Sequence, residues 1–171
     1  MDKLSKLGLK YGTDKIGKHN YLPYYHKLFK DKRESVKKVV EIGAGEGLGL
    51  RMFRDYFPNA MIYGGEIDPN RIFKEDRIEV IECDQSKGED LTRLVDKIGK
   101  DIDIWIDDGS HKPKDQAYTC RKMMPHLKDD VIYIIEDVAD LSILKYFKDY
   151  AVDVVVLSKR YDDRLIIVKH K

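Results

Sequence analysis

The chain has 171 residues, which suffices for one domain with a sizeable core but not comfortably for two. Hydrophobic residues make up 42% of it, and 32 Lys and Arg almost cancel 31 Asp and Glu, so we expect a folded protein without a nucleic-acid or membrane partner. No apolar run approaches the ~20 residues that span a bilayer, and "MDKLSKLGLKYGTDK" lacks the apolar core of a signal peptide, which predicts a cytoplasmic protein.

The first 35 residues carry helical rather than strand-like spacing. Apolar residues recur there at intervals of three and four, namely Tyr21, Tyr24, Tyr25, Leu28 and Phe29. We predict a short helix, a glycine-containing loop and a second helix, which together form a cap over one side of a sheet. The tyrosines are interpreted as packing residues of the second helix.

Residues 36–138 alternate short apolar runs with helical patterns. The strand-like runs are "KKVVEIGAG", "NAMIYGGEID", "RIEVIECD", "DIDIWIDD" and "DVIYIIEDV". The helical patterns between them are "GLGLRMFRDYF", "GEDLTRLVDKIG" and "PKDQAYTCRKMMPHL". Strands that alternate with such helices predict βαβ units, and near-continuous apolar strands fit a sheet buried on both faces. The expected fold class is therefore α/β with a doubly wound, mostly parallel sheet.

The C-terminal segment "AVDVVVLSKRYDDRLIIVKHK" departs from this alternation. Its two β-rich runs flank "SKRYDD" and leave no room for a crossover helix, so we predict a hairpin that adds an antiparallel strand to one edge of the sheet. The expected organisation is a single domain over residues 1–171, with residues 1–35 as the helical cap and residues 36–171 as the α/β core.

A glycine-rich turn follows the first predicted strand. "VVEIGAGEGLG" places Gly43, Gly45 and Gly47 where the chain enters a helix, so that backbone amides can approach a ligand. Glu66 ends the next strand, where an acidic residue can hydrogen-bond ribose hydroxyls. The turn lacks the Gly-Lys-Ser/Thr of a phosphate-cradling loop, which argues against an ATPase or GTPase. A plain tight turn and a dinucleotide site are the alternatives.

Carboxylates stand at the ends of the later strands, and in a doubly wound sheet these ends share the edge where ligands bind. Asp108 at one strand end, with Glu136 and Asp137 at the next, offers the oxygen ligands that Mg²⁺ prefers. Helix N-caps or solvated loop charges are the alternative interpretation. His111 follows Asp108 by three residues, and histidine is the side chain whose unperturbed pKa lies nearest neutrality, which suits a general base.

Together these motifs resemble a known family. The chain looks like the metal-dependent sugar O-methyltransferases of macrolide biosynthesis, the mycinamicin and macrocin O-methyltransferase type, which are class I S-adenosylmethionine-dependent methyltransferases with a Rossmann-like fold. The matching blocks occur in the family's order over most of the chain and are "YGTDKIGKHNYLPYY", "VVEIGAGEG", "CDQS", "IDDGSH" and "YIIEDV". The first block and the last two are far more specific than the glycine turn.

The resemblance implies S-adenosyl-L-methionine as cofactor and Mg²⁺ or another divalent ion as metal. It implies Asp108, Glu136 and Asp137 as metal ligands, and His111 and Asp108 as catalytic residues, with His111 the general base. The expected cofactor-binding residues are Glu41 for the methionine part, Asp84, Gln85 and Ser86 near the adenine, and Gly43, Gly45, Gly47, Glu66, Asp107, Thr13 and Lys15. Asp14 and His19 also match the first block, without individual roles.

The implied activity is methyl transfer to a hydroxyl of a sugar or glycosylated small molecule, so the expected partner is a glycoside. Enzymes of this family often assemble as homo-oligomers whose neighbours complete the site, and a homo-oligomer is an alternative to a monomer here. Three other functions stay open. They are a catechol-type O-methyltransferase acting on an aromatic diol, a non-catalytic cofactor-binding subunit and an NAD-dependent oxidoreductase.

Overall fold

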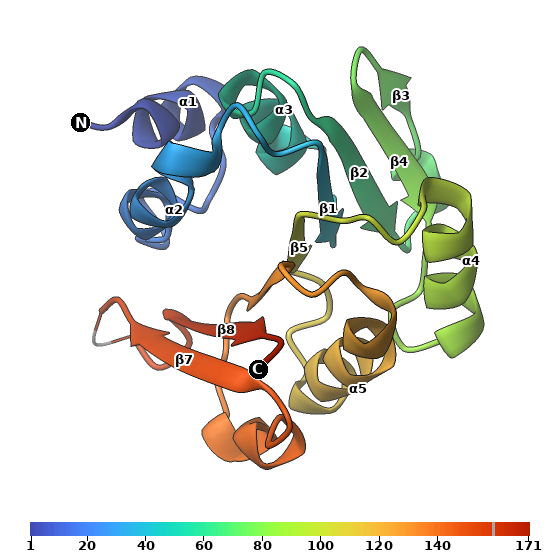
Figure 1. Cartoon of the computed structure of the whole chain (residues 1–171). Coiled ribbons are helices and arrows are strands. Elements are labelled where there is room, and N and C mark those ends of the chain that lie inside the picture. Colours follow the sequence, from blue (N-terminus) through green and yellow to red (C-terminus); the bar gives the residue numbers. More distant parts are fainter. Residues whose placement is uncertain (159) are drawn as a thin grey trace.

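The computed structural model describes residues 1–158 and 160–171 (Figure 1). Its centre is an eight-stranded sheet with the strand order β3-β4-β2-β1-β5-β6-β8-β7. The strands are β1 (Lys38–Ile42), β2 (Met61–Glu66), β3 (Lys74–Glu75), β4 (Ile78–Glu82), β5 (Ile104–Asp107), β6 (Ile132–Ile135), β7 (Ala151–Val156) and β8 (Arg164–Lys169). The α-helices are α1 (Lys3–Tyr11), α2 (Leu22–Phe29), α3 (Leu48–Tyr56), α4 (Gly88–Ile98) and α5 (Pro113–Met123).

The five central strands, β4, β2, β1, β5 and β6, run parallel. At the C-terminal edge β8 pairs antiparallel with β6, and β7 pairs antiparallel with β8. The predicted α/β fold class, a mostly parallel sheet with an antiparallel C-terminal hairpin, is confirmed. The sequence did not indicate β3, a two-residue strand that pairs antiparallel with β4 at the other edge.

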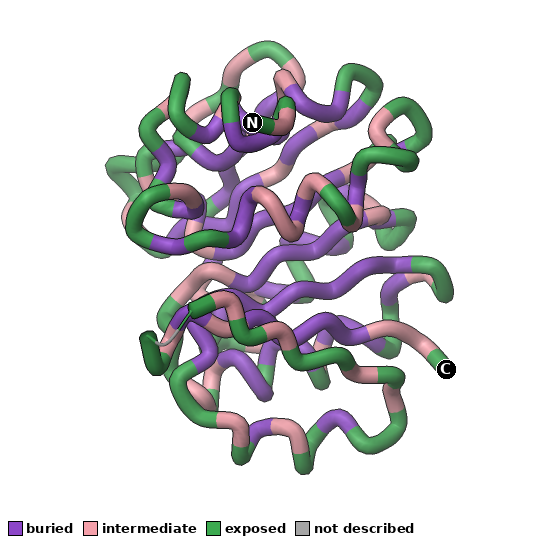
Figure 2. The backbone as a smooth tube through the Cα atoms, turned by 90° about the vertical axis from the view of Figure 1, so that its left-hand side faces the viewer, coloured by how far each residue is buried: buried purple, intermediate pink, exposed green. Residues whose placement is uncertain are grey.

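Helices cover both faces of the sheet (Figure 1). Helices α1, α2 and α3 lie on one face, where α1 contacts both of the others, and α4 and α5 lie on the opposite face. Each face has its own apolar core, and on the α5 side the rings of Trp105 and Tyr133 stack with centroids 5.9 Å apart. Buried residues follow the central strands, whereas exposed residues lie at turns and along the outer edge (Figure 2). Among the described residues no helix combines the length and apolar character needed to cross a membrane.

Short-range signals fix where the helices begin. Helix α1 begins after Asp2, whose carboxylate accepts a hydrogen bond from the Ser5 amide at 2.8 Å, and Pro113 is the first residue of α5. The described part of the chain also contains four short 3-10 helices, η1 (Lys30–Lys32), η2 (Pro69–Arg71), η3 (Met124–His126) and η4 (Leu141–Tyr146). The loop between α1 and α2, residues 12–21, reaches the carboxyl ends of β1, β5 and β6, where it contacts acidic side chains.

Candidate functional site

A cleft of about 710 Å³ opens at the carboxyl ends of the parallel strands. Its volume lies in the range of small-molecule sites. Six of the predicted cofactor-binding residues line it, namely Gly43, Gly45, Glu66, Asp84, Gln85 and Ser86. Of the predicted metal ligands, Asp108 lines the cleft, so it adjoins the space where the cofactor is expected.

The glycine turn shapes one wall of the cleft. Gly43 has φ +86°, and a Cβ atom there would lie only 2.1 Å from the backbone oxygen of Asp108, so only glycine lets the ends of β1 and β5 approach this closely. The Gly45 amide donates a hydrogen bond to Glu66 Oε2 at 2.7 Å, and Glu66 Oε1 accepts one from the Asp68 amide at 3.0 Å. Glu66 therefore holds the turn while its carboxylate lines the cleft.

Gln85 and Asp107 form a buried network beneath the loop that follows β5. Gln85 Nε2 donates to Asp107 Oδ1 at 3.0 Å and to Thr119 Oγ1 at 3.1 Å, and Gln85 Oε1 accepts a hydrogen bond from the Ser110 amide at 2.6 Å. Burial raises the pKa of Asp107 to about 7, against the lowering effect of its hydrogen bonds with Gln85 and Gly109. Asp107 does not line the cleft but supports a residue that does.

Three further predicted cofactor residues, Glu41, Gly47 and Thr13, also lie outside the cleft lining. Glu41 is 2% exposed and packs under the start of α3, where a side chain on Gly49 would meet its Oε2 at 2.9 Å. Burial raises the pKa of Glu41, and the Lys15 ammonium opposes that rise. Gly47 is the residue that precedes α3. Thr13 is buried in the loop between α1 and α2, where its Oγ1 accepts a long hydrogen bond of 3.4 Å from the Lys15 amide.

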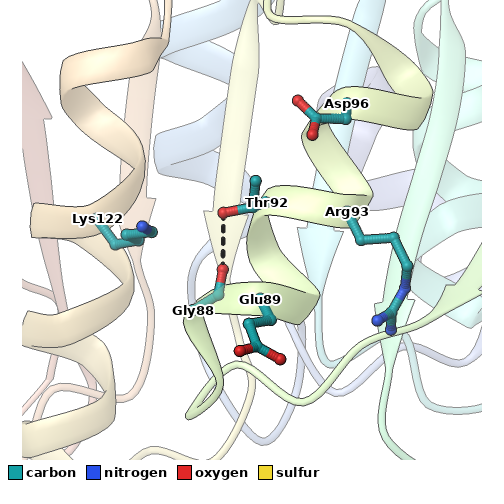
Figure 3. A pocket seen from close by; sticks show the side chains of 6 residues that line it. All are labelled: Gly88, Glu89, Thr92, Arg93, Asp96 and Lys122. Carbon is teal, nitrogen blue, oxygen red and sulfur yellow. Dashed lines mark hydrogen bonds between the residues drawn. The ribbon is translucent and has the colours of Figure 1, made fainter.

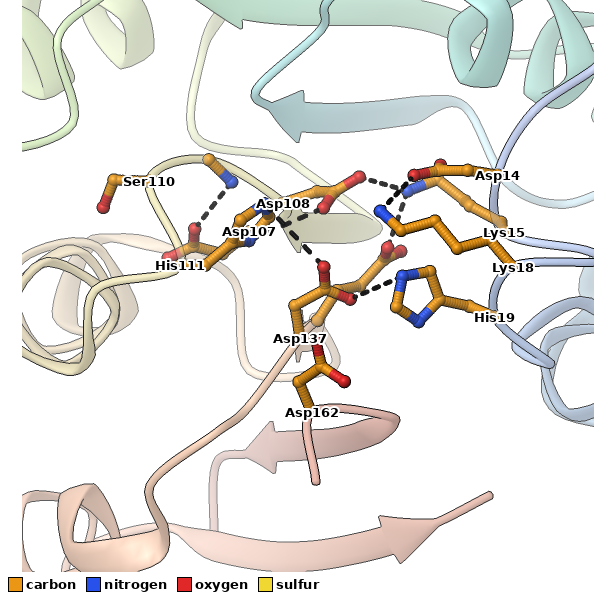
Figure 4. Close-up of polar contacts among 12 residues, drawn as sticks. Asp14, Lys15, Lys18, His19, Asp107, Asp108, Ser110, His111, Asp137 and Asp162 are labelled. Carbon is orange, nitrogen blue, oxygen red and sulfur yellow. Dashed lines mark hydrogen bonds and ion pairs between the residues drawn. The ribbon is translucent and has the colours of Figure 1, made fainter. Parts of the chain in front are cut away.

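Asp108, His111 and Asp137 face one another at the strand ends (Figure 4). Each offers one ligand atom, and these atoms all lie within 4.8 Å of one another. His111 Nδ1 is 3.9 Å from Asp108 Oδ1, and His111 Nε2 is 3.8 Å from Asp137 Oδ2. His111 and Asp137 have φ +56° and +51°, conformations that cost non-glycine residues energy and occur preferentially at functional sites. Two carboxylates and an imidazole so arranged can hold a divalent cation.

Glu136 is engaged by the head of the chain. Its Oε1 accepts a hydrogen bond from the Tyr25 hydroxyl at 2.6 Å, and its Oε2 accepts one from Lys15 Nζ at 2.7 Å. Burial raises the pKa of Glu136 well above its usual range, while the charge of Lys15 works in the opposite direction. The structure thus groups Asp108 and Asp137 with His111. Glu136, the third predicted metal ligand, is hydrogen-bonded to Lys15 instead.

Lys15 links the two parts of the site. Its ammonium lies 2.6 Å from Asp108 Oδ2, 2.7 Å from Glu136 Oε2 and 2.9 Å from Glu41 Oε1, and its side chain is only 2% exposed. Burial by itself lowers the pKa of Lys15, but the three carboxylates outweigh burial and raise that pKa well above its ordinary value. Lys15 was predicted as a cofactor-binding residue, whereas its contacts here are with acidic side chains.

Several contacts of the candidate site were not predicted from the sequence. The Tyr21 hydroxyl donates to Asp137 Oδ1, just as Tyr25 donates to Glu136. His19 is 3% exposed, and its ring nitrogens lie 3.6 Å from Asp137 Oδ1 and 3.5 Å from Asp163 Oδ1. The four-residue interval between the two tyrosines was the available signal, because it places both on one side of a helix, but the same interval also fits plain packing.

A second hollow, of about 430 Å³, lies between α4 and α5 (Figure 3). Its lining is of mixed charge and comprises Gly88, Glu89, Thr92, Arg93, Asp96 and Lys122. The Thr92 hydroxyl donates to the Gly88 carbonyl at 2.8 Å within the helix. None of the predicted site residues, all of which the structure describes, lines this hollow, so the candidate site is at the strand ends.

Comparison with known proteins relates this site to a family. The chain is 36% identical over 141 residues to the 8-demethyl-8-alpha-L-rhamnosyl tetracenomycin-C 2'-O-methyltransferase of Streptomyces olivaceus, and 37% identical over 142 residues to the mycinamicin VI 2''-O-methyltransferase of Micromonospora griseorubida. Each match covers 78% of this chain. The chain is a homologue of these two O-methyltransferases. The predicted resemblance is confirmed, although the chain spans only 37% and 35% of the length of these two relatives.

Solved structures agree with the sequence relatives. The MycE methyltransferase from the mycinamycin biosynthetic pathway, in complex with Mg and SAH, superposes with a TM-score of 0.83 at 28% identity, over 98% of this chain and 54% of MycE. A putative caffeoyl-CoA O-methyltransferase from Staphylococcus aureus, at 17% identity and a TM-score of 0.65, shares the fold. No family model matches the chain. The Rossmann-like methyltransferase fold implied by the sequence motifs is confirmed.

Proposed function

We propose that the chain is a Mg²⁺-dependent O-methyltransferase that uses S-adenosyl-L-methionine to methylate a hydroxyl of a sugar or glycosylated small molecule. One observation carries the proposal: Asp108 belongs both to the lining of the large cleft and to the group it forms with His111 and Asp137. A donor in the cleft and an acceptor on the acids would therefore be neighbours. The homologues, which are named as O-methyltransferases of a rhamnosyl tetracenomycin and of mycinamicin VI, support the same activity.

The donor atoms fit a hard divalent cation. In octahedral coordination at roughly 2.1 Å, ligand atoms are separated by about 3 to 4.2 Å. The ligand atoms of Asp108 and Asp137 lie within 4.8 Å of each other, with His111 beside them as the base rather than as a ligand. Small side-chain movements would therefore bring Asp108 and Asp137 onto one ion. Glu136 is the third ligand in this proposal, because each of its oxygens keeps a lone pair beyond the hydrogen bonds from Tyr25 and Lys15.

The residues of the chain divide the chemistry between them. Asp108, Glu136 and Asp137 would hold the divalent ion, which would supply a Lewis acid that lowers the pKa of the acceptor hydroxyl. The His111 side chain is exposed beside Asp108 and Asp137, and in this proposal its Nε2 accepts the proton that the hydroxyl loses. The glycine turn and Glu66 orient the donor, and alignment of the hydroxyl oxygen with the methyl group contributes much of the rate enhancement.

Ligand-induced stabilisation tests the donor part of the proposal. S-adenosylhomocysteine at about 100 times its Kd is expected to stabilise the fold by about 2.7 kcal/mol, and NADH is expected to leave the melting temperature unchanged. Glu66→Gln removes a charged acceptor from the cleft and is expected to weaken S-adenosylhomocysteine binding about tenfold. Glu89→Gln, in the hollow between α4 and α5, is the matched control and should bind normally. Stabilisation by NADH instead would favour the oxidoreductase alternative.

Turnover assays test the acceptor. Methyl transfer to glycosides is expected with Mg²⁺ and is expected to stop with EDTA, whereas catechols should not be methylated. Transfer to catechols alone would identify a catechol-type enzyme. Cofactor binding without Mg²⁺-dependent turnover on either class would favour the non-catalytic subunit. Size-exclusion chromatography of the same protein tests the homo-oligomer expected from the family resemblance.

A further inference from the structure

Lys15 is surrounded by acids from three adjacent strand ends. Its ammonium carries three hydrogens, and three carboxylate oxygens lie within 2.6 to 2.9 Å of it, from Asp108, Glu136 and Glu41. Glu41 is the penultimate residue of β1, Asp108 follows β5 and Glu136 follows β6, and these strands are neighbours in the sheet. Lys15 Nζ donates hydrogen bonds to Asp108 and Glu136 and forms an ion pair with Glu41, so one buried lysine engages acids from three strands.

The charge balance of this cluster depends on Lys15. Glu41 and Glu136 are 2% and 1% exposed, and unpaired carboxylates buried to this extent are strongly destabilising. Lys18 lies in the same loop and provides the contrast, because its side chain is about half exposed and its ammonium pairs with Asp14 at 3.2 Å on the surface. Exposed pairs of that kind contribute little to stability.

We propose that Lys15 is a built-in counter-cation that holds the three acids together and weakens the binding of a divalent ion to Asp108 and Glu136. It acts as a positioning residue rather than a cofactor-binding residue. The Lys15 ammonium lies beside these two carboxylates and repels a second cation that binds the same oxygens. This repulsion is strong where solvent screening is weak. The fold then tolerates the loss of metal, and the ion exchanges readily. The part of the inference that concerns the ion rests on the proposed function.

Lys15→Met removes the charge at nearly constant length, and Lys18→Met is the matched control. In EDTA we expect the melting temperature of Lys15→Met to fall more than about 6 °C below that of Lys18→Met, because three acids lose their counter-charge. On titration with Mg²⁺ we expect Lys15→Met to be stabilised with a midpoint at least tenfold lower than that of the wild type, about 1.4 kcal/mol in binding. A purely structural role for Lys15 would not tighten metal binding.

Each outcome decides the matter. Equal melting temperatures of Lys15→Met and Lys18→Met in EDTA, or a Mg²⁺ midpoint of Lys15→Met at or above that of the wild type, would overturn the inference. If Lys15→Met is unfolded in EDTA, Mg²⁺ must restore its fold, and failure to do so overturns it equally. A wild type that Mg²⁺ does not shift would instead overturn the metal centre of the proposed function, and the comparison in EDTA would still decide whether Lys15 is the counter-cation.

Discussion

Gly43→Ala tests whether the close contact between the glycine turn and the loop after β5 organises the site. The added methyl group would lie 2.1 Å from the Asp108 oxygen, 2.6 Å from the Asp108 carbonyl carbon and 2.8 Å from Gly109 Cα. All three are backbone atoms, so no side-chain rotation relieves the overlap. Either β1 or the loop that carries Asp108 must move.

The cost has two physical sources. Alanine at φ +86° is strained by about 1–2 kcal/mol, and overpacking against a rigid neighbour costs about 1–3 kcal/mol more. The expected loss in the free energy of unfolding is therefore about 2–5 kcal/mol, which lowers the melting temperature by roughly 4–20 °C at this chain length. Gly45→Ala is the matched control, because φ is +52° there and no atom of the described residues lies within 4 Å of the added methyl.

Urea denaturation of the two variants measures the difference directly. We expect Gly43→Ala to lose at least about 1 kcal/mol more than Gly45→Ala, with an unchanged dependence on urea concentration. Calorimetric titration should also show weaker S-adenosylhomocysteine binding by Gly43→Ala, since the wall of the cleft has moved. Equal losses in the two variants would show that left-handed backbone strain alone accounts for the effect, and the steric reasoning would then be wrong.

Three further predictions concern single side chains. His111→Ala should bind S-adenosylhomocysteine normally but transfer methyl groups at least ~100-fold more slowly, and a normal rate would place the general base elsewhere. Tyr25→Phe leaves Glu136 Oε1 without its hydrogen-bond donor and should lower the free energy of unfolding, measured in urea, by about 1–3 kcal/mol. Tyr24 is half-buried, and Tyr24→Phe should lower it by less than about 0.5 kcal/mol. Similar losses in the two variants would contradict the hydrogen-bond account. Because burial raises the pKa of Asp107 to about 7 in the folded state, the native protein keeps a proton that the unfolded chain loses near pH 4. The contribution of Asp107 to the free energy of unfolding should therefore fall as pH rises from about 4 to 7 and level off above pH 7. Asp107→Asn should lack this decline when the free energy of unfolding is measured at pH 5 and pH 7.5.

Local patterns in the sequence were sufficient for the architecture. Alternation of apolar strands with helical spacing predicted the parallel sheet. Apolar residues recur with different periods in strands and in helices, and each period can be recognised within a short stretch of sequence. The short "SKRYDD" linker predicted the hairpin of β7 and β8, since no crossover helix fits there. Strand β3 was not predicted, because two residues are too few to show the alternation of apolar and polar residues that identifies a strand.

The site was predictable only in part. Parallel strands end at a common edge, so the sequence placed Gly43, Glu66 and Asp108 around one cleft without any knowledge of side-chain contacts. Adjacent residues at a strand end, however, can point in different directions. Only the folded backbone, with φ +51° at Asp137, brings that carboxylate to His111 while Glu136 contacts Lys15 and Tyr25.

The sequence by itself determined the sheet, the glycine turn and the acidic edge, because each depends on residues close together in the chain. The tertiary structure alone decided that Lys15 pairs with Asp108, 93 residues away, and with Glu136, 121 residues away. No periodicity encodes such a contact, because it arises when the head helices pack on one face of the sheet and carry their loop to the strand ends. Buried acids require a counter-charge, and Lys15 in the loop between α1 and α2 lies where it provides one. No local pattern in the sequence indicates this role.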